Sequence, residues 1–331
     1  MSGPIPTGPT PTTDRSDVAA VRSAIATEIV GRDRELDLVL AAVAAGRDMI
    51  LEGPPGTSKS TLLRAITAHW GIPLVLVEGN ADLTPSRLVG HHNPARVLKE
   101  DYRPDNFVDG PLLQAMRSGG FLYVEEFNRA PEDTVDTLLT AMAERVITVP
   151  RVGTVVAADS FRIVASMNPY DNVGTTRLST SVHDRMCRLV VDYQDDAAER
   201  EIVRRRTGSG SDRIVNDSVA LTRATRIRDD IRQGSSVRGA IDLALITAQL
   251  CAMRGVPVPA DGAVPPPRDL PTDYTATVLD AMMVALSGRI HLDDTAFTTP
   301  EGVLTEIWQD HFVLDPAAAS PVEERSPPSR R

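Results

Sequence analysis

Apolar runs and helical patterns follow one another in a regular order between residues 32 and 206. Five short runs rich in Val, Ile, Leu and Phe predict strands at Asp48–Glu52, Leu74–Val77, Phe121–Val124, Arg162–Ala165 and Arg188–Asp192. Continuous apolar runs of this length are typical of strands that are buried on both faces. Because helical patterns separate them, the runs predict a parallel α/β sheet with right-handed crossovers.

The pattern changes after Asp212, where it predicts helices only. Val278, Met282 and Ala285 recur at helical spacing and give one apolar face. We therefore predict an α/β domain over residues 17–207 and a small helical domain over residues 213–314, with the Gly- and Ser-rich run Thr207–Asp212 as linker. Residues 1–16 and 315–331 are rich in Pro, Ser and Thr and are predicted to be disordered, and Val256–Pro271 to be a long loop.

Composition narrows the class of protein. The chain of 331 residues is 42% apolar and 24% charged, as expected of a globular protein with more than one domain. The net charge of −10 makes nucleic acid an unlikely partner, because phosphate backbones repel an acidic surface. Cys187 and Cys251 lie in apolar segments, which predicts buried thiols in a reducing compartment. With no signal peptide and no apolar run of about 18 residues, we expect a cytoplasmic protein.

A phosphate-binding loop is predicted between the first strand and the helix that follows it. The segment reads Gly53-Pro54-Pro55-Gly56-Thr57-Ser58-Lys59-Ser60-Thr61. Glycine allows backbone amides to converge on phosphate oxygens, and the helix N-terminus adds partial positive charge. In this pattern Lys59 lies between the β- and γ-phosphates, and the Ser60 hydroxyl is a ligand of Mg²⁺. All nine residues are predicted to bind ATP.

Ser58 departs from the usual pattern, which has glycine immediately before the lysine. We expect the position to have an ordinary negative φ, so that serine is tolerated there. The alternative interpretation of the whole segment is a Gly-Pro turn before a helix, with a solvated lysine.

Two carboxylates at the end of the third predicted strand weaken that alternative. In nucleotide-hydrolysing sites the first acid, here Glu125, holds the hydration shell of Mg²⁺, and the second, here Glu126, polarises the attacking water. Adjacent side chains on a strand point in opposite directions, so the two acids are suited to different tasks. Glu125 replaces the usual aspartate and is one methylene longer. The alternative is a solvated strand end.

The run Glu125-Glu126-Phe127-Asn128-Arg129-Ala130-Pro131 resembles the signature of MoxR-type AAA+ ATPases. The segments Asp82–Gly90, Asp109–Leu112 and Leu138–Arg145 are similar to further motifs of that family, in the same order along the chain. The resemblance covers about residues 28–292. It implies a P-loop AAA+ module, with a parallel five-stranded sheet sandwiched by helices, followed by a small α-helical lid domain.

Further site residues are implied by this resemblance. Asn168 corresponds to the amide that positions the attacking water, with a simple Asn-Pro turn as the alternative. Arg185 corresponds to the arginine finger, which reaches the γ-phosphate on a neighbouring subunit. Arg177 and Arg188 compete for that role, and a surface salt bridge is the alternative.

The resemblance also assigns roles outside the phosphate site. Arg238 begins the helix that reports the nucleotide state, and Val30 and Gly31 correspond to the segment beside adenine. His91–Val108 is similar to an insert in the second helix, and Ile147–Ser160 to a hairpin, both of which often line the pore of a ring. The pair His91-His92 is predicted to lie in a solvated loop and to bind no metal.

The resemblance implies a Mg²⁺-dependent ATPase that forms a ring, expected to be a hexamer, and remodels a client protein. MoxR-type proteins commonly act with a partner that carries a von Willebrand factor A domain. Three alternatives stay open at this stage. They are a nucleotide-binding switch with weak hydrolysis, a nucleic-acid motor, and a close cousin such as a magnesium-chelatase subunit or an ATPase that activates Rubisco or nitric-oxide reductase.

Overall fold

The computed structural model describes residues 18–169, 178–259, 271–293 and 297–313. The chain divides into two compact units between Gln194 and Asp195. The boundary lies earlier than the predicted linker, because helix α9 (Asp196–Thr207) packs on the helices that follow it. The predicted disordered ends, and most of the predicted loop Val256–Pro271, lie outside the described residues.

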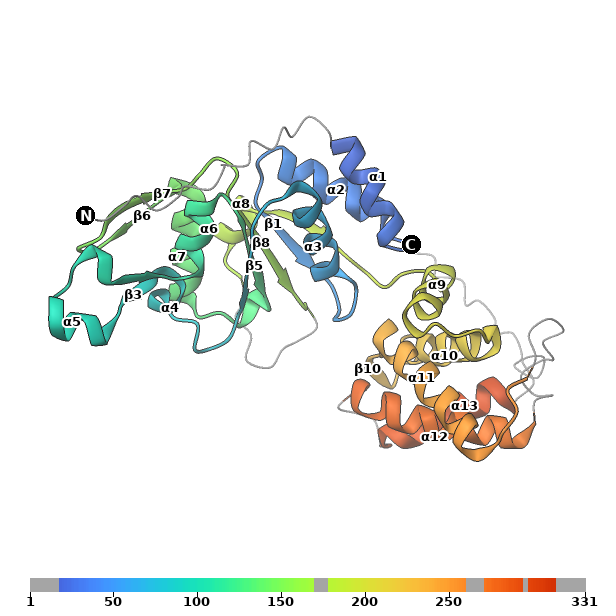
Figure 1. Cartoon of the computed structure of the whole chain (residues 1–331). Helices are drawn as coiled ribbons and strands as arrows, with labels where there is room; N and C mark the ends of the chain where they lie inside the picture. The colour runs from blue at the N-terminus through green and yellow to red at the C-terminus, as the bar shows by residue number, and fades with distance from the viewer. Residues whose placement is uncertain (1–17, 170–177, 260–270, 294–296, 314–331) are drawn as a thin grey trace, which may run out of the picture. The chain divides into compact units, whose positions relative to one another are not determined.

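The first unit contains a five-stranded parallel sheet in the order β2-β5-β8-β1-β9 (Figure 1), as the sequence predicts. Its strands are β1 (Met49–Glu52), β2 (Leu74–Glu78), β5 (Phe121–Glu125), β8 (Arg162–Met167) and β9 (Cys187–Val190). Its helices are α1 (Val18–Glu28), α2 (Asp33–Ala44), α3 (Lys59–Trp70), α4 (Pro85–Val89), α5 (Pro94–Glu100), α6 (Pro111–Ser118), α7 (Glu132–Glu144) and α8 (Thr180–Arg185).

Helices cover both faces of this sheet, with α2 and α3 on one side and α6 and α7 on the other (Figure 1). The alternation of side chains along β1 explains the two cores. Met49 and Leu51 pack with the first helices of the chain, whereas Ile50 packs with α6 and α7. Each face of a central strand is therefore apolar, which is why its sequence reads as a continuous run.

The two edge strands differ from the prediction. β2 and β9 are only partly buried, because each has one neighbouring strand and one open side. Cys187 is exposed at the start of β9, so the prediction that both thiols are buried is wrong for Cys187 and confirmed for Cys251. Exposed positions on edge strands are common because only one edge of the ladder is covered.

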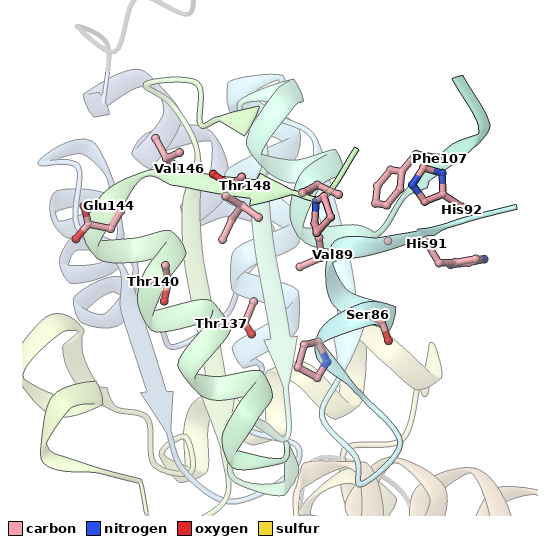
Figure 2. A pocket seen from close by; sticks show the side chains of 15 residues that line it. Ser86, Val89, His91, His92, Phe107, Thr137, Thr140, Glu144, Val146 and Thr148 are labelled. Carbon is pink, nitrogen blue, oxygen red and sulfur yellow. The ribbon is translucent and has the colours of Figure 1, made fainter. Parts of the chain in front are cut away.

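Two short hairpins project from the sheet region of the first unit. β3 (Gly90–His92) pairs with β4 (Phe107–Asp109), and β6 (Val146–Val149) pairs with β7 (Gly153–Val156). The 3₁₀ helices Pro104–Asn106 and Phe127–Arg129 complete this unit. A cavity of about 980 Å³ lies between the two hairpins and α7 (Figure 2).

His92 lines this cavity and is not part of a solvated loop. Its ring packs edge-on against Tyr102 and Phe107, with ring centres 5.2 and 5.1 Å away, so the prediction is wrong for this residue. His91, the preceding residue on β3, is exposed. Among the described residues no group of His, Cys, Asp and Glu side chains is arranged to hold a metal ion.

The second unit is a small helical bundle with its own apolar core. It contains α9, α10 (Asp212–Ala224), α11 (Val237–Arg254), α12 (Thr272–Leu286), the 3₁₀ helix Ser287–Arg289 and α13 (Pro300–Phe312). One short antiparallel pair, β10 (Ile231–Gln233) with β11 (His291–Leu292), departs from the prediction of helices only. No helix within the described ranges combines the length and apolar character that crossing a membrane requires.

Candidate nucleotide site

The predicted phosphate-binding loop leaves the carboxyl end of β1 and enters α3, as the motif requires. The amide of Gly53 donates to the carbonyl of Met167 at the end of β8, 3.1 Å away. A side chain at Gly53 would overlap the carbonyl oxygen of Val191, at 2.0 Å from its Cβ, so only glycine fits between these strands. Thr57 is buried, and its hydroxyl donates to the carbonyl of Pro54, 2.9 Å away. The loop is thus fixed by its own hydrogen bonds.

Ser58 has a φ of +67°, in the left-handed region, and the prediction of an ordinary φ is wrong. The loop must reverse direction immediately before α3, and the residue at that point takes the conformation that glycine adopts without steric cost. The Ser58 hydroxyl accepts a hydrogen bond from the Gln194 amide, 3.3 Å away. Serine is therefore accommodated here with backbone strain and one added contact.

Lys59 is held over the loop that precedes it. Its ammonium group donates to the carbonyls of Gly53 and Pro54, each 2.8 Å away, and to the Thr57 hydroxyl at 3.2 Å. The cation therefore lies within the turn formed by the loop backbone, at the start of α3. Thr61, the last residue of the predicted motif, is exposed on the first turn of that helix.

The two predicted magnesium ligands are in direct contact. The Ser60 hydroxyl donates to the carboxylate of Glu125, which ends the neighbouring β5. Tyr123 lies beneath this pair, with its hydroxyl 3.2 Å from that of Ser60, and it donates to the Ser166 hydroxyl at 3.0 Å. Burial raises the pKa of the Tyr123 phenol, so it stays protonated and remains a donor. A chain of hydrogen bonds thus joins two strands, β5 and β8, and the phosphate-binding loop.

Glu126 follows Glu125 with a φ of +50°, another left-handed residue at the carboxyl edge of the sheet. Gly79, at the end of β2, makes room for this turn, since a Cβ there would lie 2.3 Å from the carbonyl oxygen of Glu126. Arg129 forms an ion pair with the Glu126 carboxylate at 3.6 Å. Strained residues of this kind are concentrated at functional sites, where the surrounding structure holds them in place.

Asn168 is buried at the end of β8, one residue beyond the strand. Its carbonyl accepts from the side-chain amide of Asn128, which is also buried, at 3.4 Å. β8 lies between β1 and β5 in the sheet, so Asn168 lies at the same edge as the phosphate-binding loop and the two acids.

The predicted adenine segment, Val30 and Gly31, forms the turn between α1 and α2. Arg32 follows it and is almost fully buried, with its guanidinium donating to the carbonyl of Asp192 and to the Glu35 carboxylate. Arg32 thereby ties this turn to the chain just beyond β9, and β9 is the neighbour of β1.

The candidate finger residues lie in three different situations. Arg185 is exposed at the end of α8, at the amino edge of the sheet, because it precedes Cys187, which pairs with Met49 at the start of β1. Arg188 is committed to Glu52 on the adjacent strand, with its Nε 2.6 Å from the nearly buried carboxylate. This ion pair raises the pKa of the Arg188 guanidinium. Arg177 lies outside the described residues.

Known protein families and relatives match this chain. Residues 48–186 match the model of an AAA domain of the dynein-related subfamily, and residues 16–75 match the MoxR domain in the MoxR-vWA-beta-propeller ternary systems. Protein NorQ of Paracoccus denitrificans is 32% identical over 222 residues, which cover 64% of this chain and 78% of NorQ. The chain belongs to the MoxR-type AAA+ ATPases.

Other relatives have a lower sequence identity. Gas vesicle ATPase GvpN of Ancylobacter aquaticus is 28% identical over 243 residues, 67% of this chain, and the chain spans 65% of the length of GvpN. A solved structure of a mutant of Thermotoga maritima RuvB has a TM-score of 0.50 and 19% identity, over 78% of this chain and 71% of RuvB. That likeness shows the AAA+ fold alone.

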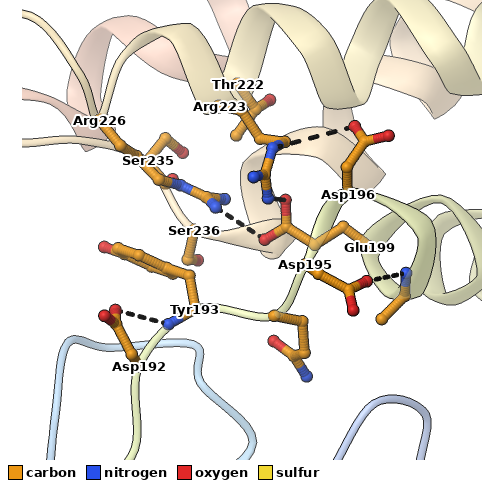
Figure 3. Close-up of polar contacts among 12 residues, drawn as sticks. Asp192, Tyr193, Asp195, Asp196, Glu199, Thr222, Arg223, Arg226, Ser235 and Ser236 are labelled. Carbon is orange, nitrogen blue, oxygen red and sulfur yellow. Dashed lines mark hydrogen bonds and ion pairs between the residues drawn. The ribbon is translucent and has the colours of Figure 1, made fainter.

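Arg238 lies in the second unit of this MoxR-type chain, exposed in the first turn of α11. The turn before α11 is held by a buried ionic cluster (Figure 3). Arg226 donates to the carbonyl of Ser235 at 2.6 Å and to Glu199 at 2.8 Å, and Arg223 donates to Glu199 at 3.2 Å. Glu199 is fully buried, so two guanidinium groups offset the desolvation of its charge. The cluster fixes where α11 begins.

Sequence reasoning missed several side chains that build the site. Tyr123 has the sequence pattern of an ordinary core residue of a strand, and only its hydrogen bonds with Ser166 and Ser60 in the structure reveal a polar role. Gln194 belongs to no motif, although it contacts Ser58. Gly79 carries a detectable signal, because it follows a strand and precedes an Asn, where a turn is expected.

Proposed function

We propose that this chain binds and hydrolyses ATP with Mg²⁺, and that it uses the energy to remodel or mature a partner protein. The observation that carries the proposal is the contact between the Ser60 hydroxyl and the Glu125 carboxylate, beside Lys59 on the phosphate-binding loop. A cation held over a loop of backbone amides, next to two hard oxygen ligands, suits a nucleotide phosphate chain and its metal ion.

The residues present fit Mg²⁺. Ser60 supplies a hydroxyl oxygen and Glu125 a carboxylate oxygen, the ligand types that this hard cation prefers. The ion, when bound, neutralises charge on the phosphate oxygens. Glu125 is held by Ser60 and stands next to the buried Tyr123, so its longer side chain is already directed at the metal position.

Glu126 is the candidate base for the attacking water, and Asn168 is the candidate for positioning that water. The left-handed backbone at Glu126 separates its carboxylate from that of Glu125, so the two acids are free for different tasks. Asn168 is held at this edge of the sheet through its backbone carbonyl, which accepts from the side-chain amide of Asn128. An amide donates and accepts without titrating, which suits that role.

Arg185 is proposed to act on a nucleotide bound by a neighbouring subunit. The phosphate-binding loop lies at the carboxyl edge of the sheet and Arg185 at the amino edge, separated by the length of β1, about 13 Å for four residues. Arg188 is unsuited, because Glu52 engages its guanidinium. A site completed from outside requires an oligomer, and we propose a closed ring, expected to be a hexamer.

A partner with a von Willebrand factor A domain is proposed from the family match. The model that matches residues 16–75 is the MoxR domain of systems that also contain such a protein and a beta-propeller. Arg238 is proposed to couple nucleotide state to the second unit, since it starts the helix that the Glu199 cluster fixes. A domain that moves as one body transmits such a change efficiently.

One observation favours a second candidate function, a nucleotide-binding switch with weak hydrolysis. Ser58 adds a Cβ and a hydroxyl at a left-handed position in the phosphate-binding loop, where glycine would leave the backbone amides unhindered.

Phosphate release by the purified full chain, with and without Mg²⁺, separates these functions. For an ATPase we expect metal-dependent turnover that falls by 100-fold or more, on the order of the loss of a catalytic base, in Glu126→Gln. ATP affinity measured by calorimetry should remain, because that carboxylate does not hold the phosphates. Tight ATP binding with equal background rates for both proteins would establish the switch instead.

A further inference from the structure

A second cavity of the first unit lies at the amino edge of the sheet and is lined by more basic than acidic side chains. It has a volume of about 510 Å³ and is lined by four arginines, Arg47, Arg145, Arg162 and Arg185. Three aspartates also line it, but Asp48 is turned inward, where its carboxylate accepts from the amide of Ile163 at 2.7 Å. Asp159 and Asp184 are exposed.

Two of the four arginines form the wall of this cavity. Arg145 donates to the carbonyls of Ala158 and Phe161, at 2.8 and 2.9 Å, and so joins the end of α7 to the start of β8. Arg162 is buried and donates to the carbonyl of Asp159 at 2.7 Å. These guanidinium groups are committed to backbone oxygens, and their role is structural.

Arg47 and Arg185 differ from that pair. Both are exposed, and over the part of the chain that the structure describes the Arg47 side chain makes no hydrogen bond and no ion pair. Arg185 donates only to the carbonyl of Ser181 in its own helix, at 3.2 Å. Asp48 interacts electrostatically with Arg47, but its carboxylate is turned inward and accepts from the amide of Ile163. The two guanidinium groups carry permanent positive charge, and an anion between them would offset their repulsion.

These two arginines line the same cavity, because each lies just before one of two neighbouring strands. Arg47 stands two residues before Met49, and Arg185 stands two residues before Cys187, the partner of Met49 on the neighbouring strand. The amide of Cys187 donates to the carbonyl of Asp48 at 2.9 Å, which extends the pairing by one more residue toward the arginines. Because both side chains line one cavity at the start of adjacent strands, the two guanidinium groups can reach one ligand.

We propose that Arg47 and Arg185 together form an anion site for the terminal phosphate of ATP bound to a neighbouring copy of this chain. The inference rests on the proposed function and adds Arg47 as a second contact supplied in trans. Guanidinium groups bind phosphate oxygens through paired, charge-assisted hydrogen bonds, and two of them stabilise the charge that develops during phosphoryl transfer.

The test is phosphate release by the full chain and by Arg47→Ala, Arg47→Lys and Arg64→Ala. Arg64 is the matched control, because it is an exposed arginine of the same unit outside the cavity. We expect Arg47→Ala to lower turnover about 100-fold, on the order of the loss of one preorganised donor, with ATP affinity unchanged. Arg47→Lys should recover part of the rate because it restores the charge without the planar fork.

Mixing two inactive variants tests whether Arg47 acts across subunits. A Lys59→Ala chain lacks the loop cation but keeps Arg47, and an Arg47→Ala chain has the reverse defect. Recovery of turnover on mixing supports the trans contact. Equal rates for Arg47→Ala and Arg64→Ala, loss of ATP affinity in Arg47→Ala, or no recovery on mixing would each overturn the proposal. If the unaltered chain binds ATP and releases no phosphate, the proposed ATPase function itself fails, which is a distinct result.

Discussion

The carboxyl and amino edges of the central sheet differ in how their polar side chains are paired. At the carboxyl edge the polar side chains bond to one another, from Glu125 through Ser60 and Tyr123 to Ser166. At the amino edge Arg47 and Arg185 are exposed, and among the described residues neither forms a close ion pair with a carboxylate. A closed network is preorganised by its own subunit, whereas unpaired cations are suited to a ligand that arrives from outside. We therefore propose that the two edges contribute different parts of one reaction.

The largest effect is expected for Arg185→Ala, which removes the proposed trans finger. Turnover should fall by about 1,000-fold or more, because an arginine that meets the transferring phosphoryl group contributes factors of that order. ATP affinity of the isolated chain should not change, because Arg185 lies at the other edge of the sheet from Lys59. Steady-state phosphate release and calorimetric titration measure the two quantities separately.

Arg188→Ala is the matched control for this experiment. Its guanidinium is paired with Glu52, whose side chain is 4% exposed, so the substitution leaves a buried carboxylate without its partner. We expect a lower melting temperature with turnover per folded molecule largely retained. If Arg188→Ala abolished turnover and Arg185→Ala did not, the assignment of the amino edge would be wrong.

The second unit also contains a network of paired charges, centred on Glu199. Glu199 is fully buried and pairs with Arg223 and Arg226, and Glu199→Gln removes the buried charge that both cations share, although Asp196 still lies 3.9 Å from Arg223. Breaking a buried pair in this way costs about 3 kcal/mol, so the unfolding temperature of the second unit should fall. Glu201→Gln on the same helix is the control. Glu201 pairs with Arg204 and Arg205 at the surface, where such a change costs less than about 1 kcal/mol.

Differential scanning calorimetry of the two variants distinguishes an ionic network that stabilises the fold from surface ion pairs that contribute little to stability. Equal melting temperatures for Glu199→Gln and Glu201→Gln would contradict the structural role of the cluster. Because the cluster fixes the turn before α11, we also expect Glu199→Gln to weaken any dependence of turnover on Arg238.

Much of the fold could be predicted, because each central strand is a continuous apolar run between two helical patterns. The exposure of the outer strands, β2 and β9, could not be predicted. It depends on strand order, and strand order is a property of the whole sheet. The short pair of β10 with β11 joins segments about 60 residues apart, and a local pattern carries no signal for such pairing.

The candidate site could be predicted where its residues are contiguous in the sequence, as in the loop from Gly53 to Thr61 and the acids Glu125 and Glu126. It was not predictable where chemistry depends on register. The sequence pattern identifies Tyr123 only as a core residue. Its hydrogen bond to Ser166 becomes visible only in the structure. Arg47 resembles any exposed arginine until the pairing of Met49 with Cys187 sets it beside Arg185.

The smallest effect is expected at Ser58, and it tests whether the backbone of the phosphate-binding loop is strained. Ser58→Gly removes a Cβ from a left-handed position, where an L-residue is disfavoured by about 1–2 kcal/mol. The greater entropy of glycine in the unfolded chain and the lost contact with Gln194 offset part of this gain. A net stabilisation of about 0.5–1 kcal/mol, or roughly 2 °C in melting temperature, should remain.

Ser58→Ala separates strain from hydrogen bonding at the same position. Alanine keeps the Cβ and its penalty but loses the hydroxyl that accepts from Gln194, so this variant should melt at or below the temperature of the unaltered chain. If Ser58→Gly also raises the rate of phosphate release, the serine slows hydrolysis, and the switch-like character of the site follows from one backbone angle. A melting temperature lower in Ser58→Gly than in Ser58→Ala would mean that the hydroxyl contact outweighs the strain.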